Sequence, residues 1–210
     1  NLKGTSNQPN NYYTPAFVLL NQFIYHTYTP TRIDITTAKG DYEQKFWKGT
    51  LSGGFKVSIV GTDNTYDFYN VIGGNEIKDN DISNRFKYTE QTNALYVNFV
   101  RDFGKLNVQA GLRLENTDYT GELITSTQQN GMKIDDNYTK LFPSAALTYM
   151  FTQKWGVNLT YSRRIDRPSY QDLNPFEFRL DELTYEKGNP DLKPQFTHSI
   201  ELSPLIMGQP

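Results

Sequence analysis

A strictly alternating stretch at residues 106–114 limits what this chain can fold into more than any other feature. One parity is entirely apolar: Leu106, Val108, Ala110, Leu112 and Leu114. The other parity holds Asn107, Gln109, Gly111 and Arg113. Successive side chains of a β-strand point to opposite faces. The stretch therefore predicts a strand with one apolar face and one polar face.

The same alternation recurs along the chain. It is clear at 50–59, 144–151 and 155–162, and it is present at 95–103 with Arg101 on the apolar parity. The aromatic content of 14 %, mostly tyrosine and phenylalanine, also favours strands. We expect an all-β protein.

Composition excludes several classes of protein. The formal net charge of −2, with no basic cluster against it, gives no electrostatic reason to expect nucleic-acid binding. The absence of cysteine excludes disulfides, thiolate metal sites and a cysteine nucleophile within the chain. No apolar run reaches the roughly 18 residues of a membrane-spanning helix, but the strands of a membrane β-barrel alternate and remain compatible with this sequence.

The connections between these stretches alternate in length. Short turns are expected near 45–49, at 103–105 and at 152–154, and long polar stretches at 66–86, 121–137 and 164–194. This order predicts an antiparallel up-and-down meander with short turns at one end and long excursions at the other. Outer-membrane barrels have this arrangement, with short periplasmic turns and long extracellular loops.

The apolar stripe also has the height of a bilayer. Nine residues from Leu106 to Leu114 rise about 30 Å, and a tilt near 45° projects this to about 21 Å, close to the roughly 25 Å apolar band of outer-membrane barrels. Aromatic residues lie beside the short turns, as in an interfacial girdle: Phe46, Trp47, Phe99, Phe103, Phe151 and Trp155. Arg101 would then lie near the periplasmic interface, where a long side chain can reach water.

A soluble fold remains an alternative at this point. An antiparallel sheet with one solvated face alternates in the same way. The chain could therefore be a soluble β-sheet binding or adhesion module, or a lipocalin-like protein that encloses a ligand. The alternating loop lengths and the aromatic residues beside the turns favour the membrane barrel.

Two late blocks resemble a known family. "YSRRIDRPSYQDLNPF" (161–176) and "GNPDLKP" (188–194) are similar to the barrel of TonB-dependent outer-membrane receptors, in the outer-membrane β-barrel protein family. "TDNTYDFYNVI" (62–72) and "NALYVNFVRDFGKLNVQAGLRLENTDYTG" (93–121) support the likeness, which extends from about 31 to 203.

The resemblance implies a barrel of about 22 strands that is closed around a plug, and location in the cell outer membrane. It also implies nutrient import driven by the inner-membrane TonB complex. The partners would be outer-membrane lipid, the rest of the barrel and plug, the TonB complex and a nutrient ligand. This chain shows no plug, no TonB box and no terminal aromatic strand signal, so we expect a fragment of such a barrel.

About seven strands are expected, near 31–45, 49–65, 86–103, 105–120, 138–152, 154–166 and 195–203. Residues 1–30 are expected to be a surface-loop segment, 31–203 a partial barrel and 204–210 an irregular tail, because Pro204 and Pro210 do not suit a central strand. An open sheet leaves unpaired backbone groups at its edges, at several kcal/mol each in hydrocarbon, so closure or partner strands are needed.

Candidate ligand contacts are few. Tyr66, Phe68 and Tyr69 in "YDFY" and Phe176 in "NPFEF" could stack on a sugar or peptide at a loop mouth, or could instead pack the loops together. Arg164 and Arg167, which lie with Arg163 near the expected extracellular rim, could contact a ligand or form an ion-pair network with Glu115 and Asp166.

No enzymatic motif stands out. Asp79 and Asp81 lack the glycine and distal glutamate of a calcium loop, and His26 and His198 lie far apart without an HExxH pattern. No GxSxG elbow is present. We therefore expect no catalytic residues, no metal site and no cofactor, and the leading expectation is uptake of a nutrient across the outer membrane.

Overall fold

The computed structural model of the chain describes residues 2–125, 132–181 and 183–206. Its strands are β1 (Leu2–Tyr13), β2 (Leu19–Phe46), β3 (Gly49–Ile72), β4 (Asn75–Lys78), β5 (Asn84–Phe103), β6 (Leu106–Thr125), β7 (Lys133–Met150), β8 (Trp155–Asp166), β9 (Glu177–Arg179), β10 (Tyr185–Lys187) and β11 (Gln195–Ile206). One helical turn, α1 (Tyr170–Leu173), follows β8.

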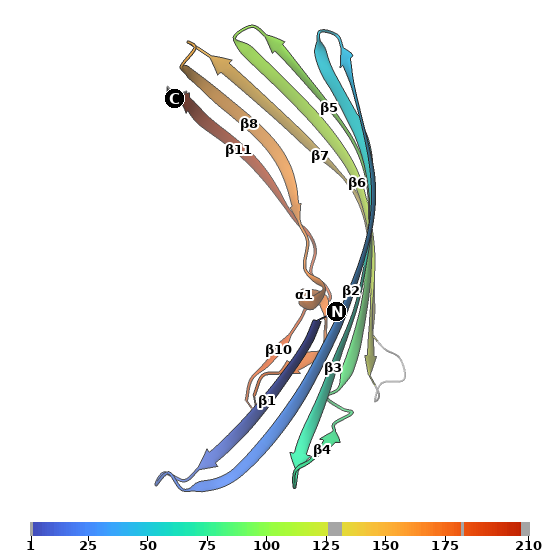
Figure 1. Cartoon of the computed structure of the whole chain (residues 1–210), viewed down its shortest axis with the longest axis vertical. Coiled ribbons are helices and arrows are strands. Elements are labelled where there is room, and N and C mark those ends of the chain that lie inside the picture. The colour runs from blue at the N-terminus through green and yellow to red at the C-terminus, as the bar shows by residue number, and fades with distance from the viewer. Residues whose placement is uncertain (1, 126–131, 182, 207–210) are drawn as a thin grey trace.

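The main sheet is an antiparallel meander in the order β1-β2-β3-β5-β6-β7-β8-β11, with β4 added beside β3. Figure 1 shows it as a tall curved wall with α1, β9 and β10 on its concave side. The seven expected strands correspond to β2, β3, β5, β6, β7, β8 and β11, and the meander is confirmed. Within the described residues no helix has the length and apolar character needed to cross a membrane.

The expected loop over 1–30 is wrong as a description of its secondary structure. Strand β1 pairs along its whole length with the first part of β2, from Leu2 opposite Thr31 to Tyr13 opposite Leu19. Backbone hydrogen bonds hold β1 in place, and its polar side chains carry no alternation that would have indicated a strand. The tip of this hairpin exposes Phe17, Val18 and Leu20.

The expected tail at 204–210 is also partly wrong. Strand β11 continues to Ile206, and Pro204 lies opposite Val157 of β8. Proline removes one backbone N–H, and the residues on both sides of Pro204 keep the pairing with β8 up to Ile206. Residues 207–210 lie outside the described residues.

Short turns join the strands at one end of the wall. The turn between β2 and β3 consists of Trp47 and Lys48, with φ of 48° and 57°. Positive φ at both central residues is the geometry of a type I′ hairpin. Gly104, with φ of 70°, begins the turn between β5 and β6. Beside these turns the guanidinium of Arg101 lies 4.3 Å from the ring of Phe103 and 5.5 Å from that of Trp47, so Arg101 is at this end as expected.

The convex face of the sheet is apolar from these turns to a defined row of residues. Phe55, Leu95, Leu114 and Leu141 are paired in turn across four strands, and each is between 41 % and 61 % exposed. One row further from the turns, Asn93, Asn116 and Thr139 replace them. The Asn116 amide donates to Thr139 Oγ1 at 3.0 Å. We call the part of the sheet between the turns and the Phe55–Leu141 row the inner half, and the part beyond it the outer half.

The concave face of the inner half is polar. Ser52, Asn98, Gly111, Ser144 and Ser162 form one row across five strands. The apolar residues at 106–114 therefore face outward and the polar ones face the hollow of the wall, as the alternation predicts.

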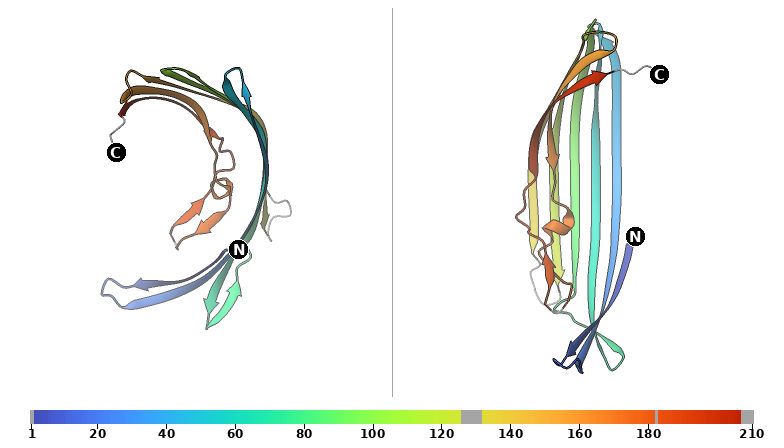
Figure 2. Two further views of the ribbon diagram at one scale, coloured as in Figure 1. Left: turned by 45° about the horizontal axis from the view of Figure 1, so that its top comes forward. Right: turned by 90° about the vertical axis from the view of Figure 1, so that its left-hand side faces the viewer.

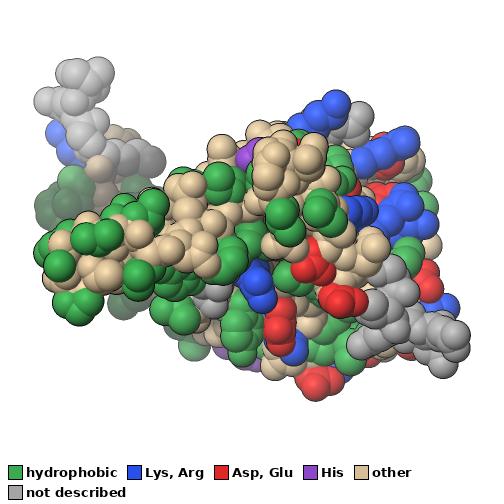
Figure 3. Space-filling model, turned by 90° about the horizontal axis from the view of Figure 1, so that it is seen from below, with side chains coloured by type: hydrophobic (Ala, Val, Ile, Leu, Met, Phe, Trp, Pro, Cys, Tyr) green, Lys and Arg blue, Asp and Glu red, His purple; other side chains and the backbone are tan. Residues whose placement is uncertain are grey.

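In the outer half the two faces exchange character. The concave side chains are buried and largely aromatic: Tyr25, Tyr66, Phe68, Phe86, Tyr88, Tyr119 and Leu123. The convex side is charged, as shown by Arg85, whose guanidinium pairs with both oxygens of Asp63 at 2.7 and 2.5 Å. Figure 3, viewed from the end opposite the short turns, shows side chains of both charges interspersed there. The protein core lies between this concave surface and the segment after β8.

Candidate functional site

Residues 167–181 and 183–194, here called the inward segment, leave β8 and cross the concave face of the outer half (Figure 2). The segment begins with a capping box around α1: the backbone N–H of Asp172 donates to Ser169 Oγ at 3.2 Å, and that of Ser169 donates to Asp172 Oδ2 at 2.8 Å. Hydrogen bonds from Ser169 hold the pKa of Asp172 below its ordinary value. Local sequence thus determines where the segment turns.

The two blocks that carry the family resemblance contact each other here. The backbone N–H of Gly188 donates to Asn174 O at 2.9 Å, and that of Asn189 to Asp172 O at 2.6 Å. A Cβ on Gly188 would lie 2.5 Å from the same two carbonyl oxygens, so only glycine allows this approach. The 188–194 block therefore fixes the turn formed by the 161–176 block.

Arg167 anchors the inward segment to the wall. Its Nη2 donates to Glu115, a nearly buried carboxylate of β6, and to Thr117 Oγ1 at 3.2 Å, and its Nε donates to the hydroxyl of Tyr138 at 3.2 Å. Glu90 Oε1 lies 4.0 Å from Nε. Burial lowers the pKa of Arg167, but Glu115, Tyr138 and Glu90 more than offset this and raise it above its ordinary value. The predicted pairing with Glu115 is present.

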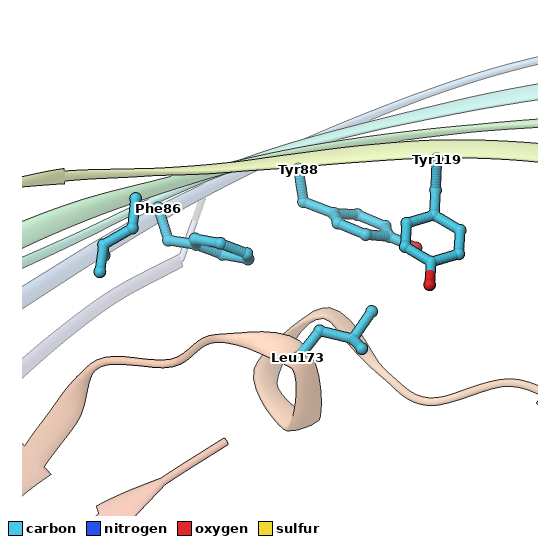
Figure 4. Close-up of a cluster of buried hydrophobic side chains, with 5 residues drawn as sticks. Phe86, Tyr88, Tyr119 and Leu173 are labelled. Carbon is cyan, nitrogen blue, oxygen red and sulfur yellow. The ribbon is translucent and has the colours of Figure 1, made fainter. Parts of the chain in front are cut away.

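Apolar contacts hold the rest of the segment. Leu173 of α1 points into a cluster with Phe86, Tyr88 and Tyr119 (Figure 4). A second cluster joins Tyr66 and Phe68 of the wall to residues of the inward segment, Phe176 and Phe178. The ring of Phe178 meets that of Tyr66 edge-on at 5.1 Å. The segment is packed on the wall as a protein core would be.

The residues that were predicted to contact a ligand therefore lie in three different places. Tyr66, Phe68 and Phe176 come together in the second cluster, and Phe68 is fully buried, so a ligand could reach its ring only if the inward segment moved. Tyr69 lies on the convex face, edge-on to Tyr28 at 5.4 Å. Arg164 is exposed and lines a cavity on the concave face.

This cavity, of about 740 Å³, extends from the anchor at Arg167 into the inner half. We call it the basic cavity, for the five cationic residues that line it: Lys56, Arg113, Arg163, Arg164 and Arg167. Two carboxylates, Glu90 and Glu115, also line it. The lining therefore has three more positive charges than negative ones.

Arg163 enters the cavity because β7 and β8 separate. Their pairing ends at Ser144 opposite Ser162, and Arg163 Nη1 then donates to the carbonyl oxygen of Leu141 at 2.9 Å. Its guanidinium lies 4.9 Å from the ring of Phe196 and 5.8 Å from that of Phe142. Parity along β8 places Arg163 on the opposite face from Arg164, so alternation alone gives no indication of this position.

Sequence reasoning missed several residues of this region: Arg113, Glu90, Tyr138, Leu173 and Gly188. For Arg113 and Glu90, the polar parity of their strands was the available signal. For Gly188 the available signal was its place at the start of the 188–194 block, to which the sequence analysis gave no structural role. The contact between the two blocks depends on tertiary structure, and no local pattern predicts it.

Comparison with known proteins agrees with this architecture. The model of the outer membrane protein beta-barrel family matches residues 1–207. No curated protein matches the sequence. Among solved structures, the crystal structure of the ferric citrate transporter FecA in the unliganded form is similar, with a TM-score of 0.50 and 14 % sequence identity over 69 % of this chain. The chain spans about a quarter of that structure, since 24 % of it is covered.

The likeness to FecA, at this low identity, shows the fold: the wall described above is similar to a barrel wall. The match to the family model covers nearly the whole chain, including both the curved sheet and the inward segment. The chain belongs to the outer membrane protein beta-barrel family.

Proposed function

We propose that this chain forms part of the wall of a TonB-dependent outer-membrane receptor that imports a nutrient. Membership of the family places the protein in the outer membrane, and this excludes the soluble binding module and the lipocalin-like alternative. The apolar convex face of the inner half would contact outer-membrane lipid. The rest of the barrel and a plug, the TonB complex and a nutrient ligand would be its other partners. The proposal assigns no catalytic step.

The observation that carries the proposal is the inward segment. The two blocks that resemble TonB-dependent receptors fold into one unit, fixed to the concave face by Arg167 and by Leu173. A segment held across the lumen narrows the path for solutes. A narrowed barrel is suited to selective, energised uptake, whereas a diffusion pore needs an open aqueous channel.

The unpaired edges of the sheet are a further argument that the chain is part of a larger, closed barrel. Within the described residues, β11 has no partner on its outer side, and residues 32–46 of β2 pair only with β3. Unpaired backbone groups in hydrocarbon cost several kcal/mol each. Neighbouring strands at both edges would remove this cost, as in a closed barrel.

The test uses the protein produced from its complete gene and purified from outer membranes in detergent. We expect it to bind the purified periplasmic C-terminal domain of TonB in a calorimetric titration. We also expect deletion of the gene and deletion of tonB to give the same growth defect under nutrient limitation, without further loss in the double mutant. A protein that fails to bind TonB and that conducts ions continuously in planar bilayers would contradict the proposal.

A further inference from the structure

The basic cavity differs from the rest of the molecule in its charge. The chain as a whole has a formal net charge of −2, yet five cationic side chains and only two carboxylates line this one cavity. None of the residues of the two aromatic clusters lines this cavity. Its charge therefore needs its own explanation.

The two carboxylates do not neutralise all five cations. Glu115 and Glu90 are engaged by Arg167, and Arg113 Nε lies 3.5 Å from Glu115 Oε2. Arg163 is bound to a backbone carbonyl through Nη1. Within the described ranges, Lys56 and Arg164 have neither a hydrogen-bond nor an ion-pair partner. Positive charge is therefore left without compensation on the cavity wall.

Two arginines that line the basic cavity also have buried guanidinium N–H groups without a hydrogen bond. The buried Nε atom of Arg163 has no hydrogen-bond acceptor among the described residues, and the buried Nε atom of Arg113 has only the 3.5 Å ion pair with Glu115. A buried donor without an acceptor is destabilising, and such groups in native proteins usually have an unseen partner. Both atoms belong to residues that line the basic cavity.

We propose that the basic cavity binds an anionic solute that carries carboxylate or phosphate groups. Guanidinium groups recognise both kinds of anion through paired, charge-assisted hydrogen bonds. Ser144 supplies a hydroxyl group on the same wall, which can donate to a remaining oxygen of such a solute. The cavity opens on the concave face, which is the lumen side of the proposed barrel, so lipid headgroups on the convex side do not reach it.

This inference deepens the proposed function and rests on it, because an import path brings solutes into the lumen. The two can nevertheless fail separately. Binding of an anion to the purified protein measures the cavity alone, whereas TonB binding and the growth defect measure import. A protein that binds TonB but no anion overturns the cavity assignment only, and the opposite result overturns import only.

The experiment titrates the full-length protein in detergent, at low ionic strength, with three probes: inorganic pyrophosphate, tricarballylate and uncharged glycerol. We expect at least one of the two anions to bind and glycerol not to bind. The preferred anion then shows whether phosphate or carboxylate is recognised. Binding should weaken as salt is added, because the interaction is between exposed and partly exposed charges.

The test variant is Lys56→Gln combined with Arg164→Gln, which removes two cations that have no structural partner. Its affinity for the anion should fall about tenfold, corresponding to the loss of one to two charge-assisted contacts. The matched control is Lys87→Gln combined with Lys133→Gln, which removes two cations from the convex face and should bind as the wild-type protein does. Heat-modifiable migration in gels confirms that each barrel is folded.

Two results would overturn the assignment. One is wild-type protein that binds neither pyrophosphate nor tricarballylate more tightly than glycerol, which is expected if acidic residues elsewhere in the full-length protein fill the cavity. The other is equal affinity in the test variant and the control. The first comparison uses only wild-type protein, so it stands even if the test variant does not fold.

Discussion

Both halves of β6 alternate between apolar and polar residues, but the apolar residues lie on the convex face in the inner half and on the concave face in the outer half. From Leu106 to Leu114 the exposed apolar residues are convex and the polar residues are concave. From Glu115 to Leu123 the convex residues are polar, and Tyr119 and Leu123 are buried on the concave side under the inward segment. The parity of the strand does not change at the boundary. What changes is which of the two alternating sets of residues is apolar: the convex set before the boundary and the concave set after it.

The difference shows that alternation identifies which residues share a face but does not identify what covers that face. In the inner half the apolar side faces outward, where the proposed barrel would meet lipid. In the outer half, beyond the apolar band, the convex face meets water and the apolar side needs a protein partner, which the inward segment provides. The two halves should therefore respond differently to the same kind of substitution.

The largest expected effect is Phe68→Ala in the outer half. Truncation of this fully buried ring should reduce the free energy of unfolding by about 4 kcal/mol, because it removes apolar contacts and leaves a cavity. Phe55→Ala, on the convex face of the inner half, should cost about 2 kcal/mol or less, because lipid fills the space. Reversible unfolding from lipid vesicles measures both. Equal costs would mean that the two faces have similar surroundings.

Arg167→Gln should have the next largest effect. It leaves Glu115 nearly buried without its main partner, which should cost about 3 kcal/mol and loosen the inward segment. Arg164→Gln, three residues away at an exposed position with no hydrogen-bond or ion-pair partner among the residues that the structure describes, should change stability by less than about 0.5 kcal/mol. Unfolding titrations give the energies, and protease cleavage within 168–194 reports the segment. Similar results for both variants would refute the anchoring role of Arg167.

A charge introduced on the convex face should have a different effect on stability in the two halves. Ala110→Arg, at the centre of the apolar stripe, should cost about 2–3 kcal/mol because it places a cation near the middle of the bilayer. Thr120→Arg, on the same face of the same strand but in the outer half, should be nearly neutral because this position faces water. Folding yield and stability in vesicles measure the pair. A neutral Ala110→Arg would contradict contact with lipid.

The smallest expected effect is at the turn between β2 and β3. Lys48 has φ of 57°, a left-handed conformation that a side chain disfavours. Lys48→Gly should therefore stabilise the hairpin by about 1 kcal/mol. The substitution tests the type I′ geometry independently of the two faces. Destabilisation by a similar amount would show that the lysine side chain contributes more than its backbone strain costs.

Much of the fold could be predicted from sequence because the alternation of neighbouring residues determines which side chains share a face of a strand. Leu106–Leu114, the turn at Gly104 and the position of Arg101 near the turns all follow from period-two patterns and turn chemistry. Strand β1 could not be predicted in this way, because its polar side chains show no alternation and its backbone bonds to β2 hold it. The continuation of β11 past Pro204 depends on its pairing with β8, which sequence alone does not reveal.

The candidate site was less predictable for a different reason. The pairing of Arg167 with Glu115 joins residues 52 positions apart in sequence, and the burial of Phe68 depends on where the inward segment lies. Short local stretches pointed to these residues but did not decide between ligand contact and packing. The basic cavity depends further on the separation of β7 from β8, which brings Arg163 inward.

The most direct test of the two-faced wall is the environment of single labels along β6. The chain contains no cysteine, so a spin label on a cysteine introduced at Ala110, Gln109 or Thr120 would be unique within it. In vesicles, the label at 110 should be accessible to oxygen and shielded from a water-soluble nickel reagent, while labels at 109 and 120 should show the reverse. A label at 110 that is shielded from both reagents, or accessible to nickel, would contradict the account.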